Sequence, residues 1–241
     1  MLIPATIIIF GGLTFSRASQ WSSYELLIAY NAHHHPRSAR AQTELGGLFA
    51  TQKKFGQARK AFLSAIELRP RDPSLLIGLQ MIDANQGLVP DSRIDEQIAD
   101  LIREYPLKST FFWTLKHVAE CVQTNCKSLN RSLELWTKTT LAKNGGRQTK
   151  SILYNYLAIS LVSQNKPGEA VEALINAYKH DPRNTNALLN LAELYIHLGQ
   201  YSNAETILGH VEKSAISDGS KDAAIVASMR ERISKSTQNL K

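Results

Sequence analysis

The sequence predicts an all-α fold in which antiparallel helix pairs stack into a right-handed superhelical solenoid. One helix-pair pattern occurs twice between residues 151 and 215, at a spacing of 34 residues that aligns Leu157 with Leu191. A third copy lies upstream, at residues 39–70. Strands are not expected, because the sequence has no convincing alternating run bounded by hairpin turns. A helix pair of this kind cannot bury its own apolar face, so it must stack on neighbouring pairs.

The three copies share small and large residues at equivalent positions. Small residues at fixed points let two antiparallel helices approach closely, and large apolar residues fill the seam between them. The equivalent positions are Leu157 and Leu191, Ala158 and Ala192, Ala170 and Ala204, Leu174 and Leu208, with Leu45, Gly46, Phe49, Ala58, Phe62, Ala65 and Pro70 in the upstream copy. With 241 residues, 43% of them hydrophobic, the chain can form a sizeable core in one extended domain.

Residues 1–20 are expected to be a membrane-helix stub or anchor. Residues 1–15 carry no charge and are strongly apolar. As a helix they would rise about 22 Å, which is short of the roughly 30 Å hydrocarbon core of a bilayer. A secretory signal fits poorly, because no positive residue precedes the apolar run. We favour the end of a membrane helix whose remainder lies upstream; a short apolar helix that caps the solenoid is the alternative.

The solenoid itself is expected to begin at residue 21. A first helix runs from about Trp21 to His33 and ends at the three histidines and Pro36. The first clear repeat, residues 39–72, contains helices over about 37–52 and 55–68. Asp72-Pro73 then starts the next helix, because Asp caps a helix well and Pro is tolerated in the first turn.

Residues 73–143 are expected to form two degenerate helix pairs. The first pair covers 75–85 and 92–105, and its second member carries an apolar stripe at helical spacing. The second pair covers 108–122 and 129–142, and a segment with two cysteines separates its helices.

Asn144-Gly145-Gly146 breaks the chain before two regular repeats, at residues 151–184 and 185–216. A loop is expected at Ser217 to Ser220, followed by a helix at 222–238. This last helix is more polar, which suits the end of a solenoid that would otherwise expose an apolar face. About eleven helices are expected in one stack.

The repeats resemble the tetratricopeptide repeat (TPR) family, whose period is 34 residues. Near-consensus matches cover 39–70 and 151–215, and the region between them is compatible but degenerate. The aromatic residue favoured near the start of the first helix is present only as Tyr154. The resemblance implies a non-catalytic module that binds a protein or peptide partner in the concave groove formed by the first helix of each pair.

A narrower resemblance rests on an apolar helix end, Arg17, Trp21, and then a TPR that opens with the sequence from Pro36 to Ala41. This order is similar to bacterial inner-membrane proteins in which a glycosyltransferase-like or O-antigen-polymerase-like domain precedes a periplasmic TPR tail. Such tails often carry a short paired-cysteine segment, and Cys121 and Cys126 lie where it is expected. The catalytic carboxylates of such a transferase would belong to the membrane part, so none is assigned to this chain.

The two cysteines, Cys121 and Cys126, have two interpretations. A C-x4-C pair without further ligands is a poor zinc site. In a reducing compartment the residues are ordinary thiols, whereas in the periplasm a local disulfide would join the helix end to the following turn. We favour the disulfide, with a structural role.

Catalysis, cofactor binding, metal binding and nucleic-acid binding are not expected. No Ser-His-Asp set, glycine-rich phosphate loop or paired-carboxylate arrangement is present. His33, His34 and His35 project in different directions from a helix end, so they form a poor metal site. The net charge is +7, but the basic residues are scattered rather than gathered in a stripe with stacking aromatics.

The groove holds the candidate binding residues. Asparagine amides can bond a peptide backbone in both directions, and apolar side chains can seat its side chains. The chaperone-type clamp for a C-terminal carboxylate requires Lys and Arg, which are absent at these positions. By register the groove residues are Asn155, Ile159, Val162, Asn186, Leu189, Asn190, Glu193 and His197, with Thr43, Gly47 and Ala50 as upstream equivalents.

The leading functional hypothesis is a membrane-tethered TPR module in the periplasm, at the bacterial inner membrane, that binds a peptide or protein. The alternative is a regulatory or acceptor-recruiting C-terminal tail of a membrane glycosyltransferase or polysaccharide polymerase. A third hypothesis is a cytoplasmic scaffold whose N-terminus is only a packing helix.

Overall fold

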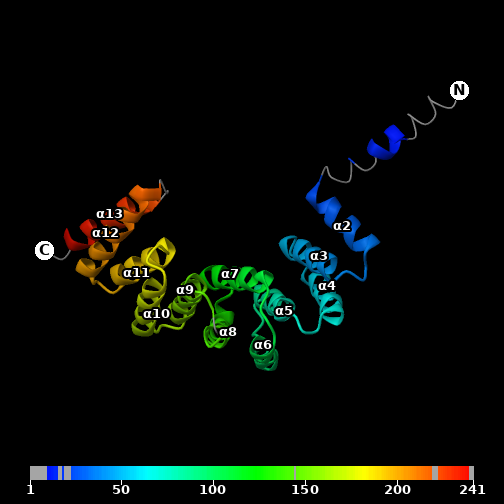
Figure 1. Cartoon of the computed structure of the whole chain (residues 1–241), viewed down its shortest axis with the longest axis horizontal. Coiled ribbons are helices and arrows are strands. Elements are labelled where there is room, and N and C mark those ends of the chain that lie inside the picture. The colour runs from blue at the N-terminus through cyan, green and yellow to red at the C-terminus, as the bar shows by residue number, and fades with distance from the viewer. Residues whose placement is uncertain (1–9, 16–17, 19–22, 144, 219–221, 239–241) are drawn as a thin grey trace. The chain divides into compact units, whose positions relative to one another are not determined.

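A computed structural model describes residues 10–15, 18, 23–143, 145–218 and 222–238 (Figure 1). The chain divides into two compact units, Met1–Val89 and Pro90–Lys241, which we describe separately. Within the described ranges every regular element is a helix and no strand occurs, which confirms the predicted all-α class.

The N-terminal unit contains four described helices, which pack in chain order, each against the next. Ser38 caps the second of them by accepting a hydrogen bond from the Ala41 N–H, and Asp72 caps the fourth, with Pro73 in its first turn. These caps lie at the starts that the sequence predicts. The helices are α2 (Tyr24–His34), α3 (Ala39–Thr51), α4 (Phe55–Leu68) and α5 (Pro73–Asn85).

The core of this unit is organised around Phe62 of α4. Its ring packs with Ala58, Leu79 and Ile82, and it lies against two glycines, Gly46 of α3 and Gly78 of α5. A methyl group at Gly46 would lie 2.5 Å from a ring carbon of Phe62, and one at Gly78 would collide with the same ring. Only glycine therefore allows both neighbouring helices to approach this side chain so closely.

The C-terminal unit contains eight described α-helices and one short 3-10 helix. Each of the last three helix pairs packs as an antiparallel hairpin or against the pair beside it, with close contacts of α9 with α10 and α11 with α12. The helices are α6 (Ser92–Glu104), α7 (Ser109–Thr124), η1 (Lys127–Leu129), α8 (Asn130–Leu141), α9 (Arg147–Ser163), α10 (Pro167–His180), α11 (Thr185–His197), α12 (Tyr201–Asp218) and α13 (Asp222–Gln238).

The repeat positions predicted from the 34-residue spacing form the core of this unit. Leu157 and Leu191 belong to one cluster of buried residues that also contains Ala170 and Leu174. Ala204 and Leu208 belong to the next cluster and are fully buried. The small residues lie where α9 meets α10 and α11 meets α12, so the pattern reports close helix approach as expected.

Four helices end in the same way. Lys53, Gly87, Asn165 and Gly199 have positive φ values of 57°, 75°, 59° and 71°. After each of them, the next residue donates its backbone N–H to the carbonyl five residues earlier, as in the Schellman motif. The positions 53 and 87, and again 165 and 199, are separated by 34 residues, so this helix stop repeats with the same period as the core.

Lys53 is the position at which this stop is least favourable, because a side chain with a Cβ is strained in the left-handed region. The Lys53 side chain is exposed, so its removal costs no packing. We expect Lys53→Gly to raise the free energy of unfolding of the N-terminal unit by about 1 kcal/mol in urea denaturation. Asn165→Gly should give a smaller gain, because Asn tolerates this conformation. A loss of stability in Lys53→Gly would contradict the assignment of the stop.

The structure corrects several predicted boundaries. The helices expected to form one pair over 75–105 belong to different units: α5 to the first and α6 to the second. Gly87, with its positive φ, ends α5 in the same way as the first helix of a repeat ends, which the degenerate sequence did not indicate. α9 begins at Arg147 rather than Ser151, with Gly146 as N-cap, and α12 continues to Asp218, into the predicted loop.

The predicted apolar N-terminal helix is only partly within the described residues. Residues 10–15 are helical and exposed, whereas 1–9, 16–17 and 19–20 lie outside the described ranges. Among the described helices, none combines the length and the apolar character that a bilayer crossing requires. The membrane stub therefore stays a prediction.

Candidate peptide-binding groove

A groove lies on the C-terminal unit, between the four helices α7, α9, α11 and α13. One cavity of about 780 Å³ is lined by residues of all four helices, including Glu120, Ile159, Asn190 and Met229. A second cavity of about 400 Å³ extends it toward the ends of α7, α9 and α11. The two cavities share Gln123, Ile159, Asn190 and Glu193, so they form one continuous groove, which we call the α7–α13 groove.

Most of the residues predicted from the repeat register line this groove. Ile159, Asn190 and Glu193 border both cavities, which places the predicted register at its centre. The others divide between the two: Asn155, Asn186 and Leu189 line the larger cavity, and Val162 and His197 line the smaller one.

Asn155 is not the free recognition amide that the sequence suggests. Its side chain is 8% exposed, and its Oδ1 accepts a hydrogen bond of 2.8 Å from Nδ2 of Asn190. The pair joins α9 to α11 and fixes the orientation of the Asn190 amide. Leu189 is also 8% exposed, so it forms the floor of the groove. Asn186, in contrast, is exposed and can reach a bound chain.

Glu193 is the charged centre of the groove. Both of its carboxylate oxygens accept hydrogen bonds of 2.8 Å from the guanidinium of Arg232 on α13, and His197 Nε2 lies 3.1 Å away. The hydrogen bonds from Arg232 hold the pKa of the Glu193 carboxyl below its ordinary value, although partial burial raises it. The ion pair therefore neutralises both charges and attaches α13 to α11.

The Glu193–Arg232 pair gives the C-terminal unit a defined pH dependence. Because the folded pKa lies below the model value of 4.5, the pair stabilises the fold above pH 4.5 and ceases to do so as the pH falls through the folded pKa. We expect Glu193→Gln to lower the free energy of unfolding at pH 7 by at most about 1 kcal/mol, since both groups are partly exposed. In urea denaturation at pH 3 this difference should disappear.

Glu231→Gln is the matched control, because Glu231 pairs with Lys235 on the exposed side of the same helix. It should change stability less at either pH. A difference between wild type and Glu193→Gln that persists at pH 3 would show that the ion pair is not its cause.

Sequence reasoning missed two walls of the groove. α13 was expected only to cap the solenoid, yet Ile225, Met229 and Arg232 line the larger cavity. Their i, i+4, i+7 spacing was the available signal. α9 also contributes Tyr156, whose pKa is raised to about 12 by burial and by the charge of Glu120 on α7. The phenol is therefore a neutral donor across the physiological range.

The upstream equivalents are less suited to binding. Ala50 packs against the Phe62 cluster, so it belongs to the core rather than to a groove. The hydroxyl of Thr43 donates to the Ala39 carbonyl of its own helix at 2.7 Å, and Gly47 offers no side chain. The binding surface that the geometry supports therefore lies on the C-terminal unit.

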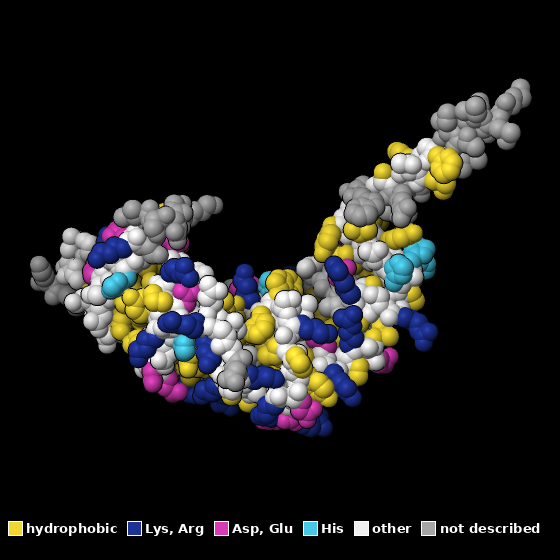
Figure 2. Space-filling model, in the orientation of Figure 1, with side chains coloured by type: hydrophobic (Ala, Val, Ile, Leu, Met, Phe, Trp, Pro, Cys, Tyr) yellow, Lys and Arg dark blue, Asp and Glu magenta, His cyan; other side chains and the backbone are white. Residues whose placement is uncertain are grey.

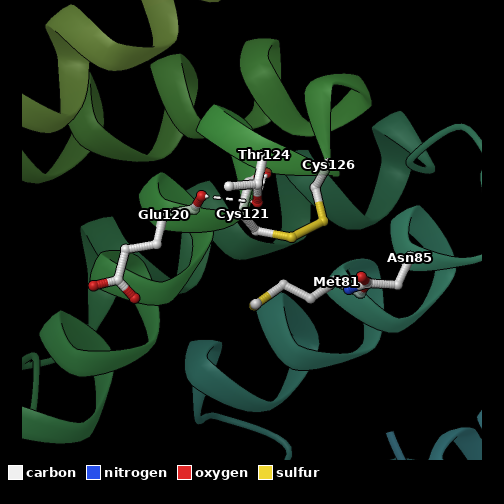
Figure 3. Close-up of a disulfide and its surroundings, with 6 residues drawn as sticks. All are labelled: Met81, Asn85, Glu120, Cys121, Thr124 and Cys126. Carbon is white, nitrogen blue, oxygen red and sulfur yellow. Dashed lines mark hydrogen bonds between the residues drawn. A yellow bond between two sulfur atoms is a disulfide. The ribbon is translucent and has the colours of Figure 1, made fainter. Parts of the chain in front are cut away.

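Cys121 and Cys126 form a disulfide at the end of α7 (Figure 3). The backbone N–H of Cys126 also donates to the Cys121 carbonyl at 2.8 Å. Beside it, the Thr124 hydroxyl donates to the carbonyls of Glu120 and Cys121, each at 3.2 Å. The disulfide thus joins the helix end to the turn, in the arrangement that we expected for an oxidising compartment.

The described residues show no cluster of three or more His, Cys, Asp and Glu side chains that could hold a metal ion. His33 and His34 contact each other and Tyr30 by their rings rather than converging on one point. On the face shown in Figure 2, Lys and Arg side chains are spread over both units and interspersed with apolar and acidic ones.

Comparison with known families identifies the class of protein. Tetratricopeptide repeat models match residues 23–73 and 161–215, one in each unit. The chain therefore carries tetratricopeptide repeats in both units, and the predicted TPR-type helix pairs are confirmed. Repeats of this class generally mediate interactions between proteins rather than catalysis. No curated protein sequence matches the chain.

Solved structures agree on the fold. Yeast Tom70 superposes with a TM-score of 0.59 at 18% identity, over 91% of this chain and 44% of its own, so the chain spans less than half of Tom70. MamA from Desulfovibrio magneticus RS-1 matches with a TM-score of 0.46 at 14% identity, covering 76% of this chain and 97% of its own. YrrB, described as a TPR protein with an unusual peptide-binding site, matches at 0.43 and 11% identity, covering 85% and 97%.

Proposed function

We propose that the chain is a non-catalytic interaction module that binds an extended peptide segment of a protein partner in the α7–α13 groove. The observation that carries this proposal is the continuity of the groove, in which two cavities of about 780 and 400 Å³ share Ile159, Asn190 and Glu193. A peptide crossing four helices at the usual spacing of 8–10 Å would span about nine extended residues.

The lining favours a peptide with apolar side chains and few charges. Ile159, Leu189 and Met229 lie on three successive helices and can receive apolar side chains. The charges of Glu193 and Arg232 are already paired, and Glu120 lies close to both Lys116 and His117. A charged peptide residue would have to displace such a pair, whereas the amides of Asn186 and Asn190 can bond a neutral backbone.

We also propose that the module acts in the periplasm, tethered to the inner membrane through residues 1–20. The apolar, charge-free N-terminal run and the Cys121–Cys126 disulfide support this location, because disulfides persist in oxidising compartments. Protein isolated without reductant in the presence of a maleimide should remain unlabelled. Labelling of both thiols would instead favour the cytoplasmic hypothesis.

The binding function is tested with a displayed library of random nonapeptides, selected on the full chain. We expect binders with apolar residues at several positions and little net charge. Ile152→Lys, at a residue that is 44% exposed and lines the larger cavity, should weaken their binding at least about tenfold.

Leu198→Lys is the control, because Leu198 is 40% exposed at the end of α11 and lines neither cavity. It should bind the selected peptides like the wild type. Failure to select any peptide, or equal effects of the two substitutions, would overturn the proposed function.

A further inference from the structure

The end of α7 departs from the helix stop that the other repeats use. In α3, α5, α9 and α11 a residue with positive φ reverses the chain, and the next N–H bonds to the carbonyl five residues earlier. In α7 the same five-residue bond is present, from Cys126 N–H to the Cys121 carbonyl at 2.8 Å. The residue between them and the turn, Asn125, has a φ of −119°. The left-handed residue that normally ends the helix is therefore missing here.

The disulfide occupies the place of the missing stop. It joins Cys121 to Cys126, which are the same two positions that the backbone bond connects. In Schellman motifs, a contact between the side chains at these two positions often reinforces the stop. Here that contact is a covalent bond. Cys126 also begins η1, since its carbonyl accepts the Leu129 N–H at 2.9 Å.

The residues next to the disulfide form one wall of the groove. Val122 and Gln123, in the last turn of α7, and Lys127, in η1, all line the smaller cavity. Gln123 also lines the larger one. These three side chains lie within four residues of a cysteine, so their positions depend on where α7 ends.

We infer that the Cys121–Cys126 disulfide is the helix stop of α7 and makes partner binding in the α7–α13 groove dependent on oxidation. This inference rests on the proposed function. In the oxidised protein the wall is preorganised for the peptide. In the dithiol form the end of α7 loses its stop, and the wall must be ordered again each time a peptide binds.

The redox step needs a thiol reductant. A thiolate of a dithiol such as dithiothreitol attacks one sulfur of the disulfide and forms a mixed disulfide, releasing the other cysteine as a thiolate that takes up a proton. The second thiol of the reagent then displaces the remaining cysteine. Two electrons pass to the protein disulfide, the reagent becomes a cyclic disulfide, and both cysteines end as thiols.

The experiment compares four forms of the full chain: oxidised wild type, wild type reduced with dithiothreitol, C121S/C126S, and C121S/N125G/C126S. The third variant removes the bond, and N125G then supplies the residue type that ends α5 and α11. Binding is measured with a fluorescent nonapeptide selected on oxidised wild type. Amide hydrogen exchange at residues 121–129 reports on the helix end without any ligand.

We expect the reduced protein and C121S/C126S to bind the peptide about tenfold more weakly and to exchange faster at residues 121–129. C121S/N125G/C126S should recover most of the affinity and protection, whether or not a reductant is present. Equal affinity and exchange in the oxidised and reduced proteins would overturn the inference while leaving the groove intact. If no peptide is selected, the proposed function fails, and unchanged exchange on reduction would separately overturn the role of the disulfide as the helix stop.

Discussion

Replacing Phe62 with alanine is expected to lower the free energy of unfolding of the N-terminal unit by about 3–5 kcal/mol. The side chain is 8% exposed and packs with Ala58, Leu79 and Ile82, so its removal leaves a cavity among three helices. The surrounding backbone cannot close easily, because Gly46 and Gly78 have no side chains to fill the space. Urea denaturation followed by far-UV circular dichroism, with hydrogen exchange to locate the loss in α3–α5, measures the effect.

Gly78→Ala provides the converse test of the same contact. A Cβ at this position collides with the Phe62 ring, so the substitution should destabilise the unit by about 1–3 kcal/mol, although alanine favours a helix. The smaller side chain of Phe62→Leu should relieve the collision, and the double variant should lose less than the sum of the single losses. Additive losses would mean that ring and glycine do not meet as described.

Replacing Trp136 with alanine is expected to have an effect of similar size in the C-terminal unit. Trp136 lies on α8, is 0% exposed, and heads the largest fully buried side chains of the described residues. α8 packs against both α6 and α9, so the loss of the indole should weaken the stack on both sides. We expect a reduction of about 3–5 kcal/mol in the free energy of unfolding, measured by urea denaturation.

Trp136→Phe separates the volume of this side chain from its polar atom. The Trp136 Nε1 is buried without a hydrogen-bond partner among the described residues, which is unfavourable for the folded state. Phenylalanine keeps most of the apolar volume and removes this donor, so the loss should be much smaller than for alanine. If both variants lose the same free energy, the indole N–H has a partner that this account lacks.

Local signals in the sequence predicted most of the helices. α4 has the predicted bounds, Phe55–Leu68, and α5 begins at the predicted Asp72 cap with Pro73 in its first turn. Small and large residues at a 34-residue spacing predicted which positions are buried between α9, α10, α11 and α12. Such signals are local or strictly periodic, and therefore one sequence is sufficient to read them.

The groove was predicted only in part, because its chemistry depends on contacts between distant side chains. The register placed Asn155 and Asn190 on the correct face, but it could not show that the two amides bond to each other. It also could not show that Arg232 crosses to Glu193, since α13 is outside the periodic pattern and its position depends on packing over Val226, Met229 and Ile233.

The division of the chain into two units was likewise hidden. The helices at 75–85 and 92–105 are adjacent in sequence and both amphipathic, so a pair was the simplest reading. α5 instead packs against α4, and α6 packs against α8, which is separated from it by α7 and η1. Non-local packing of this kind leaves no periodic trace in a single sequence.

Site-specific photocrosslinking tests the central claim, that the first helices of the C-terminal repeats form the binding surface, most directly. A photoreactive residue is placed at Asn186, which is exposed in the groove, or at Glu172, which is exposed on α10 and lines neither cavity. With a peptide selected on the oxidised chain, we predict a covalent product from position 186 and only background from position 172. A product from position 172 alone, or equal products from both, would contradict the account.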